Sequence, residues 1–377
     1  MKSTRTSKLI VILALILAMS SVMLAACNGG GSETTTDSEE PAAETTSDAD
    51  TETTAEDAAE SEDTAPEASG EFKYGKIDIP GKDGALCAAP IYIAYENGYY
   101  AEEGFDVNLI SADTETRKIG LNNGTIPIVN GDFQFFPSIE EGVKVKVVEG
   151  LHFGCITIVV PEGSTIKTAA DLKGKKIGVD EIGGTPHQVA SLWVENAGLK
   201  AKDNQDVTFV PFSDGNLEIE AAEKGEIDAA AIWDPFGALA VEEHGFTKIF
   251  DLSTDPLFAG KYCCFLYASE KVLAEDPEKV RALLRAYNKA QDWIAANPEE
   301  ASKIISEKKY SSIENIDLAS ELVKSYQYPT HAQTENDQNQ VYDNVLYFVE
   351  ELAKVGYLKT TDPESFAKDI YFDVKSE

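Results

Sequence analysis

Basic residues, histidines and cysteines are scarce in this sequence of 377 residues. Lysine and arginine total 32 against 66 aspartates and glutamates, which gives a formal net charge of −34 at pH 7. A protein that binds nucleic acid needs a basic face for the phosphates, so this balance argues against nucleic acid as a partner. Only 4 histidines and 5 cysteines occur, and they do not stand at the short spacings typical of a metal site. We therefore expect no metal ion, although scattered ligands would leave no such pattern.

Motifs of the common catalytic sites are missing as well. The sequence contains no Gly-x-Ser-x-Gly, no His-Glu-x-x-His and no P-loop. Each of these motifs has a definite chemical task, namely nucleophilic attack, zinc binding or phosphate binding. Their absence favours a binding protein without a cofactor over an enzyme.

Long apolar runs are confined to the N-terminus. Lys2, Arg5 and Lys8 precede an apolar stretch that closes with Leu-Ala-Ala-Cys at residues 24–27. This is the layout of a secretory signal, and the apolar part is too short for a typical membrane span. The closing tetrapeptide resembles a bacterial lipobox, which implies that residues 1–27 are a lipoprotein signal peptide and that Cys27 is acylated. We expect a lipid anchor on the extracellular face of a bacterial cell membrane; the alternative is an uncleaved anchor helix.

Residues 28–70 have neither lysine, arginine nor aromatic side chains, and they carry 14 acidic residues. Such a segment buries too little apolar surface to offset the entropy of ordering, and its like charges repel one another. We expect a disordered acidic tether between the anchor and the folded part.

Residues 71–377 alternate short apolar runs with helical stretches, which is typical of an α/β protein. Helices are expected over 88–97 and 185–197, each ending at a glycine, and the chain after residue 270 is expected to be almost entirely helical. The chain leaves the first α/β unit near residue 160 and returns near residue 262. We therefore expect lobe 1 to comprise 71–160 and 262–377, and lobe 2 to comprise 161–261, with a ligand cleft between them. The expected strands are 106–110, 126–129, 143–148, 156–160, 176–179, 207–210, 229–232 and 265–268.

Four cysteines fall within these lobes, and export would permit disulfide bonds. Their spacing does not resemble a compact disulfide framework, and adjacent cysteines rarely bridge each other without strain. We interpret them as buried free thiols. They are Cys87, Cys155, Cys263 and Cys264.

Four segments resemble the nitrate/sulfonate/bicarbonate (taurine-type) binding proteins. Residues 91–107 read IYIAYENGYYAEEGFDV and are similar to the opening helix and strand of that family. Residues 171–179 (DLKGKKIGV), 225–236 (GEIDAAAIWDPF) and 276–282 (DPEKVRA) are similar to later segments, in the same order. The resemblance implies a type II periplasmic-binding-protein fold, with two lobes joined by two hinge strands. It also implies a monomer that captures a small-molecule ligand and delivers it to the permease and ATPase subunits of an ABC importer.

The resemblance extends to the thiamine-precursor branch of the family. Cys263, Cys264 and Phe265 partly resemble the longer cysteine run of the eukaryotic pyrimidine-synthase enzymes on this fold, but only two cysteines match. The histidine of that branch near the first loop is absent, since residues 85–90 read ALCAAP. A pyrimidine-synthase-like enzyme is therefore the alternative function.

The candidate ligand contacts lie at strand ends and helix starts, where a cleft ligand meets the backbone of such folds. Small residues at Cys87 and Ala88 would let N–H groups approach a ligand, and tight packing is the alternative. Gly184 would allow the same close approach, and Thr185 would donate to the ligand or cap its helix. Aromatic and acidic side chains in these loops favour a planar neutral or basic ligand over a strong anion. The full predicted set is Cys87, Ala88, Asn130, Asp132, Phe133, His152, Gly184, Thr185, His187, Trp233 and Asp234.

Overall fold

The computed structural model describes residues 72–82, 84–334 and 338–374. The predicted signal peptide, Cys27 and the acidic tether lie outside the described residues. Within the described part, no helix is both long enough and apolar enough to cross a membrane. All of it falls within one compact unit that begins at Asp63.

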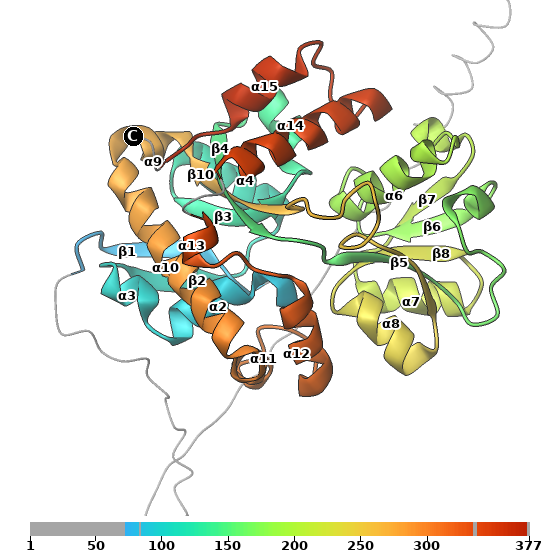
Figure 1. Cartoon of the computed structure of the whole chain (residues 1–377), viewed down its shortest axis with the longest axis horizontal. Helices are drawn as coiled ribbons and strands as arrows, with labels where there is room; N and C mark the ends of the chain where they lie inside the picture. The colour runs from blue at the N-terminus through green and yellow to red at the C-terminus, as the bar shows by residue number, and fades with distance from the viewer. Residues whose placement is uncertain (1–71, 83, 335–337, 375–377) are drawn as a thin grey trace, which may run out of the picture. The chain divides into compact units, whose positions relative to one another are not determined.

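One half of this unit is built on two small sheets (Figure 1). Strands β1 (Lys76–Pro80) and β2 (Asp106–Ile110) pair in parallel, and β3 (Ile128–Asp132), β10 (Cys264–Ser269) and β4 (Val145–His152) form an antiparallel sheet in the order β3-β10-β4. Helix α2 (Ala89–Glu96) packs against α10 (Pro277–Ala296).

The other half is a single five-stranded sheet. Its strands are β5 (Ile156–Val160), β6 (Lys176–Val179), β7 (Thr208–Pro211), β8 (Ala229–Trp233) and β9 (Thr247–Asp251), in the order β7-β6-β8-β5-β9. The three central strands β5, β6 and β8 are almost wholly buried, as expected for strands covered by helices on both faces. The helices of this half are α6 (Thr185–Asn196), α7 (Gly215–Glu223) and α8 (Phe236–His244).

The chain connects the three-stranded sheet to the five-stranded sheet twice. Residues 153–155 run from β4 to β5, and residues 252–263 return from β9 to β10. We call these two segments the first and second crossing. They touch at Gly154, where an added Cβ would lie 2.8 Å from the backbone nitrogen of Ser253. The lobe boundary proposed from the sequence at residue 161 lies one strand beyond the first crossing, because β5 belongs to the five-stranded sheet. The boundary proposed at residue 261 lies within the second crossing.

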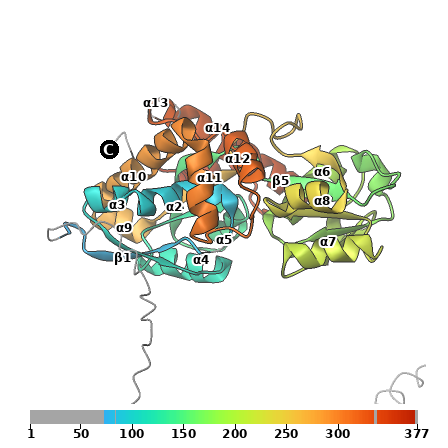
Figure 2. The same ribbon diagram turned by 90° about the horizontal axis from the view of Figure 1, so that it is seen from below.

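The C-terminal third is helical, as predicted (Figures 1 and 2). Pro277 stands in the first turn of α10, where its missing N–H has no intrahelical partner to lose. The apolar stripe of α10 is buried against the core. Helix α14 runs from Gln338 to Val355. The remaining helices are α3 (Tyr99–Glu102), α4 (Thr114–Asn123), α5 (Phe135–Glu140), α9 (Glu270–Glu275), α11 (Pro298–Glu307), α12 (Ile316–Ser325), α13 (His331–Thr334) and α15 (Pro363–Ile370), with 3₁₀ turns η1 (Leu86–Ala88), η2 (Ala169–Leu172) and η3 (Lys202–Asn204).

All eight predicted strands are present, with ends shifted by at most four residues. Two observed strands, β1 and β9, were not predicted. Strand β9 is mostly exposed or half-buried, so it lacks the apolar run that identified the central strands. The predicted left-handed glycines after α2 and α6 are confirmed, with φ of 74° at Gly98 and 83° at Gly198.

Candidate functional site

Two predicted site residues meet where the two halves face each other. Asp132 ends β3 of the first half, and Thr185 opens α6 of the second half. The Thr185 hydroxyl donates a hydrogen bond to Asp132 Oδ1. Both side chains are buried, so this bond joins the two halves away from solvent. Thr185 does not cap its helix, because the N-cap position is occupied by Gly184.

Burial dominates the electrostatics of Asp132. It raises the pKa of this carboxyl to about 7, while hydrogen bonds from Thr185 and from the backbone N–H of Gln134 act in the opposite direction. The folded state therefore favours the neutral acid more strongly than the unfolded chain does.

Ionisation of Asp132 should make stability depend on pH. A carboxyl with a raised folded pKa stabilises the fold fully below its unfolded pKa, and this contribution is lost as pH rises through the folded pKa of about 7. We expect the free energy of unfolding of the wild type to fall by on the order of a few kcal/mol between pH 4 and pH 8 because of this ionisation. Asp132→Asn should lack this decrease. Denaturant titrations of both proteins across this range measure it. Parallel stability curves for the two proteins would show that the carboxyl is not held neutral.

Two other predicted residues lie near this junction. The Trp233 indole N–H donates to Asp180 Oδ2 at 2.9 Å, within the second half. His187 Nδ1 accepts a hydrogen bond from the backbone N–H of Gly183 at 2.8 Å. The hydroxyl of Tyr357, a residue just after α14, lies 2.9 Å from the same nitrogen. Burial lowers the pKa of His187 to about 4, so this imidazole is neutral at pH 7.

The remaining predicted residues are mostly buried in the first half. Phe133 stacks on Phe348 with ring centroids 4.3 Å apart and belongs to the core. Asn130 lies within β3, and its side-chain oxygen has no hydrogen-bond partner in the described part of the chain. Cys87 and Ala88 belong to the buried turn η1, and the Cys87 carbonyl accepts from the Tyr328 hydroxyl at 2.8 Å.

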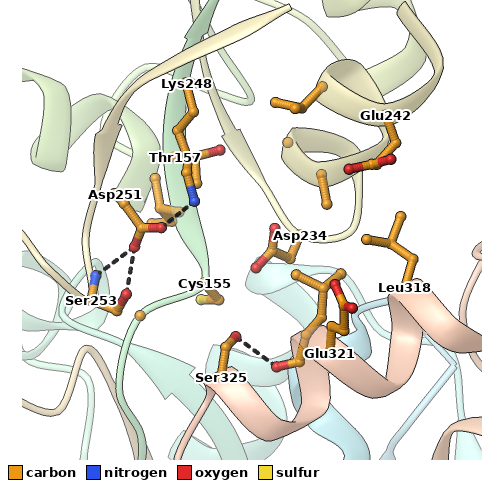
Figure 3. A pocket seen from close by; sticks show the side chains of 16 residues that line it. Cys155, Thr157, Asp234, Glu242, Lys248, Asp251, Ser253, Leu318, Glu321 and Ser325 are labelled. Carbon is orange, nitrogen blue, oxygen red and sulfur yellow. Dashed lines mark hydrogen bonds and ion pairs between the residues drawn. The ribbon is translucent and has the colours of Figure 1, made fainter. Parts of the chain in front are cut away.

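A cavity of about 270 Å³ opens between the second half and helix α12 of the first half (Figure 3). Asp234 is the predicted ligand contact that lines it. Side chains from β5, α8 and β9 supply one side, and α12 supplies the other. The polar and charged lining residues are Thr157, Asp234, Glu242, Lys248, Asp251, Ser253, Glu321 and Ser325, and Cys155 contributes a thiol.

Acidic groups outnumber basic groups in this lining. Lys248 is the basic residue among them, and its ammonium pairs with Asp251 Oδ2 at 2.5 Å. Asp251 also accepts hydrogen bonds from the Ser253 backbone and hydroxyl. Burial, with the nearby Cys87 and Asp251, raises the pKa of Asp234 to about 8. A cation in the cavity would therefore face carboxyl groups that lack a basic partner in the lining, whereas an anion would face no unpaired base.

Glu321 and Ser325 of α12 were not among the predicted contacts. They stand far along the chain from Asp234, in a helix whose apolar face gives an ordinary core-facing pattern. Nothing local in the sequence distinguishes them from other solvated positions. Only the packing of α12 beside the second half brings them to the cavity.

The arrangement of two α/β halves, two crossings and a cavity between the halves is that of a periplasmic binding protein. The alkanesulfonate-binding protein SsuA of Xanthomonas axonopodis pv. citri superposes with a TM-score of 0.62 at 16% identity, covering 79% of this chain and 98% of that one. The predicted fold class is thereby confirmed.

A model of the NMT1/THI5 like family matches residues 87–301, and the chain belongs to this family. A Brucella abortus protein named as a binding protein is 26% identical over 236 residues, which is 61% of this chain and 69% of that protein. The 4-amino-5-hydroxymethyl-2-methylpyrimidine phosphate synthase THI13 of Saccharomyces cerevisiae is 28% identical over 229 residues, which is 57% of this chain and 65% of the enzyme. The family resemblance drawn from the four sequence segments is confirmed.

Proposed function

We propose that this protein is the extracytoplasmic solute-binding component of an ABC importer, that it is held at the membrane by lipidated Cys27, and that it binds as a monomer without catalysis. The family match and the similarity to named binding proteins support this role. Ligand contacts from both halves would favour a closed form over an open one. The permease and ATPase subunits would then recognise the closed form.

The charge of the cavity lining supports a neutral or cationic organic solute. Asp234, Glu242 and Glu321 have no basic partner within the lining, since Lys248 is already paired with Asp251. None of the 16 lining residues is aromatic, so charge and hydrogen bonding carry this proposal rather than stacking. A volume of about 270 Å³ lies just below the range of about 300–1,000 Å³ usual for ligand pockets. A single-ring molecule such as an aminopyrimidine has the size and basicity that this cavity suits.

Thermal unfolding of the full-length chain against a ligand panel tests this proposal. The panel holds nitrate, bicarbonate, alkanesulfonates, aminopyrimidines, thiamine and nucleobases. A ligand at a hundredfold excess over its Kd adds about 2.7 kcal/mol to stability, because it binds the native state alone. We expect selective stabilisation by an aminopyrimidine or a related base. Stabilisation by nitrate or a sulfonate alone would contradict the proposed ligand class and leave the transport role standing.

The similarity to THI13 makes a pyrimidine-synthase-like enzyme the second candidate. A synthase forms the pyrimidine phosphate, whereas a binding protein only takes up a solute and releases it unchanged. Incubation of the protein with a small-molecule cell extract, followed by mass spectrometry of the pyrimidine phosphate over time, separates the two functions. No increase in the pyrimidine phosphate is expected of the binding protein.

A further inference from the structure

Four side chains gather at one buried point, and Cys155 is the one among them that also lines the cavity. His152, Cys155, Cys263 and Cys264 each offer a ligand atom, and all these atoms lie within 4.8 Å of one another. We call them the His–Cys cluster. All four side chains are buried, and the three cysteines are free thiols, as the sequence predicted.

The His–Cys cluster lies where both crossings meet the first half. His152 and Cys155 stand at the two ends of the first crossing, between β4 and β5. Cys263 and Cys264 stand at the end of the second crossing, where β10 begins. Residues more than a hundred positions apart are thus brought together by the topology that connects the two halves.

Three of the separations within the cluster are close to those of ligands on one tetrahedral metal ion. Cys263 Sγ lies 3.8 Å from Cys264 Sγ and 3.7 Å from His152 Nδ1, and Cys155 Sγ lies 4.0 Å from Cys264 Sγ. Zinc–sulfur bonds of about 2.3 Å and zinc–nitrogen bonds of about 2.0 Å place tetrahedral ligands about 3.5–3.8 Å apart. A disulfide would need sulfurs about 2.05 Å apart, so the observed geometry is that of separate thiols.

Burial without hydrogen-bond partners also distinguishes His152. Its Nε2 has no hydrogen-bond partner among the described residues, and its ring centroid lies 5.5 Å from that of Tyr326 and 5.8 Å from that of Tyr328. Burying an unpaired polar group costs free energy, and Nδ1 lies 3.7 Å from the Cys263 sulfur, which is a weak hydrogen-bonding group. Coordination of a metal ion by this imidazole would offset that cost.

We propose that the His–Cys cluster binds one metal ion of the zinc class, as a closed site of four protein ligands that fixes the two crossings to each other. Three sulfurs and one imidazole suit a soft or borderline ion rather than Mg²⁺ or Ca²⁺, which prefer oxygen. Binding displaces the thiol protons to solvent and involves no oxidation. Four protein ligands leave no open position, so the ion is a structural component and not the transported solute. This role is independent of the ligand class proposed for the cavity.

The test uses the full chain, stripped with a chelator under reducing conditions and titrated with Zn²⁺ or Co²⁺ alone. We expect one ion per chain, a rise in the unfolding temperature with Zn²⁺, and the visible and near-ultraviolet bands of tetrahedral cobalt thiolate with Co²⁺. Cys263→Ser and His152→Asn should each weaken binding by more than about 100-fold, because loss of an outer-shell partner alone costs about 10–100-fold.

His244→Asn is the matched control, since His244 is solvent-accessible and paired with Glu223 outside the cluster. It should leave affinity and stoichiometry unchanged. Equal losses in His152→Asn and His244→Asn would mean adventitious surface binding and would overturn the proposal. A Cys155–Cys264 disulfide in the isolated protein, found by mass mapping, would overturn it too. So would a wild-type protein that binds Co²⁺ without thiolate bands, and this last readout does not require any variant to fold.

Discussion

Replacing Asp234 by asparagine should remove the pH dependence of solute binding in the cavity. The wild-type carboxyl has a pKa of about 8 because it is buried near Cys87 and Asp251, so it is mostly neutral at pH 6 and increasingly ionised above pH 8. Affinity for a cationic solute should therefore rise with pH across this range. A hydrogen bond to a charged group contributes about 1.5–3 kcal/mol, which corresponds to roughly 10–100-fold in Kd. Calorimetric titrations with thiamine at several pH values measure the effect, because the positive charge of its thiazolium ring does not change with pH.

Asp214→Asn provides the matched control for this experiment. Asp214 lies in the same half, is exposed and caps α7 by accepting from the backbone N–H of Asn216. Asparagine caps a helix about as well as aspartate does, so this variant removes one carboxylate and little else. We expect its pH profile to match the wild type. An affinity that falls as pH rises in the wild type would indicate an anionic solute, and a flat profile would show that Asp234 does not contact the ligand.

The pattern of apolar residues predicted most of the fold, because the buried strands carry continuous apolar runs. Strand β5 reads ITIVV and is fully buried, and its predicted bounds are those observed. Strand β9 reads TKIFD and pairs with β5 at the edge of the sheet. Its polar outer positions follow from that edge location, which no local pattern reveals. Helix α2 and its glycine were predicted because a left-handed terminus has a strong residue preference.

The cavity and the His–Cys cluster were less accessible to sequence reasoning. Asp234 was predicted from its place at a strand end, but Glu321 belongs to a helix that reaches the cavity only through tertiary packing. Cys155 and Cys263 stand far apart in the sequence, so no ligand spacing relates them. The adjacent cysteines at 263–264 were the one visible signal. Pairings of this kind are set by which strands neighbour each other, and here β10 lies between β3 and β4.

Gly154→Ala should strongly destabilise the protein. Gly154 has φ of 63°, and its new Cβ would lie 2.6 Å from Ser253 Cβ and 2.8 Å from the Ser253 backbone nitrogen. The left-handed conformation costs an L-residue about 1–2 kcal/mol, and overpacking adds about 1–3 kcal/mol. We expect a total loss of roughly 2–5 kcal/mol in the free energy of unfolding, measured by denaturant titration.

Gly163→Ala separates backbone strain from steric conflict. Gly163 has φ of 78°, but nothing lies within 4 Å of the position that a new Cβ would take, so this variant should lose only the roughly 1–2 kcal/mol of conformational strain. The difference between the two variants therefore measures how closely the first crossing is held against the second. If both variants lose the same free energy, the crossings separate freely at Gly154. A larger loss in Gly154→Ala means that the two crossings are packed tightly against each other at this point, as binding of one metal ion by residues of both crossings would require.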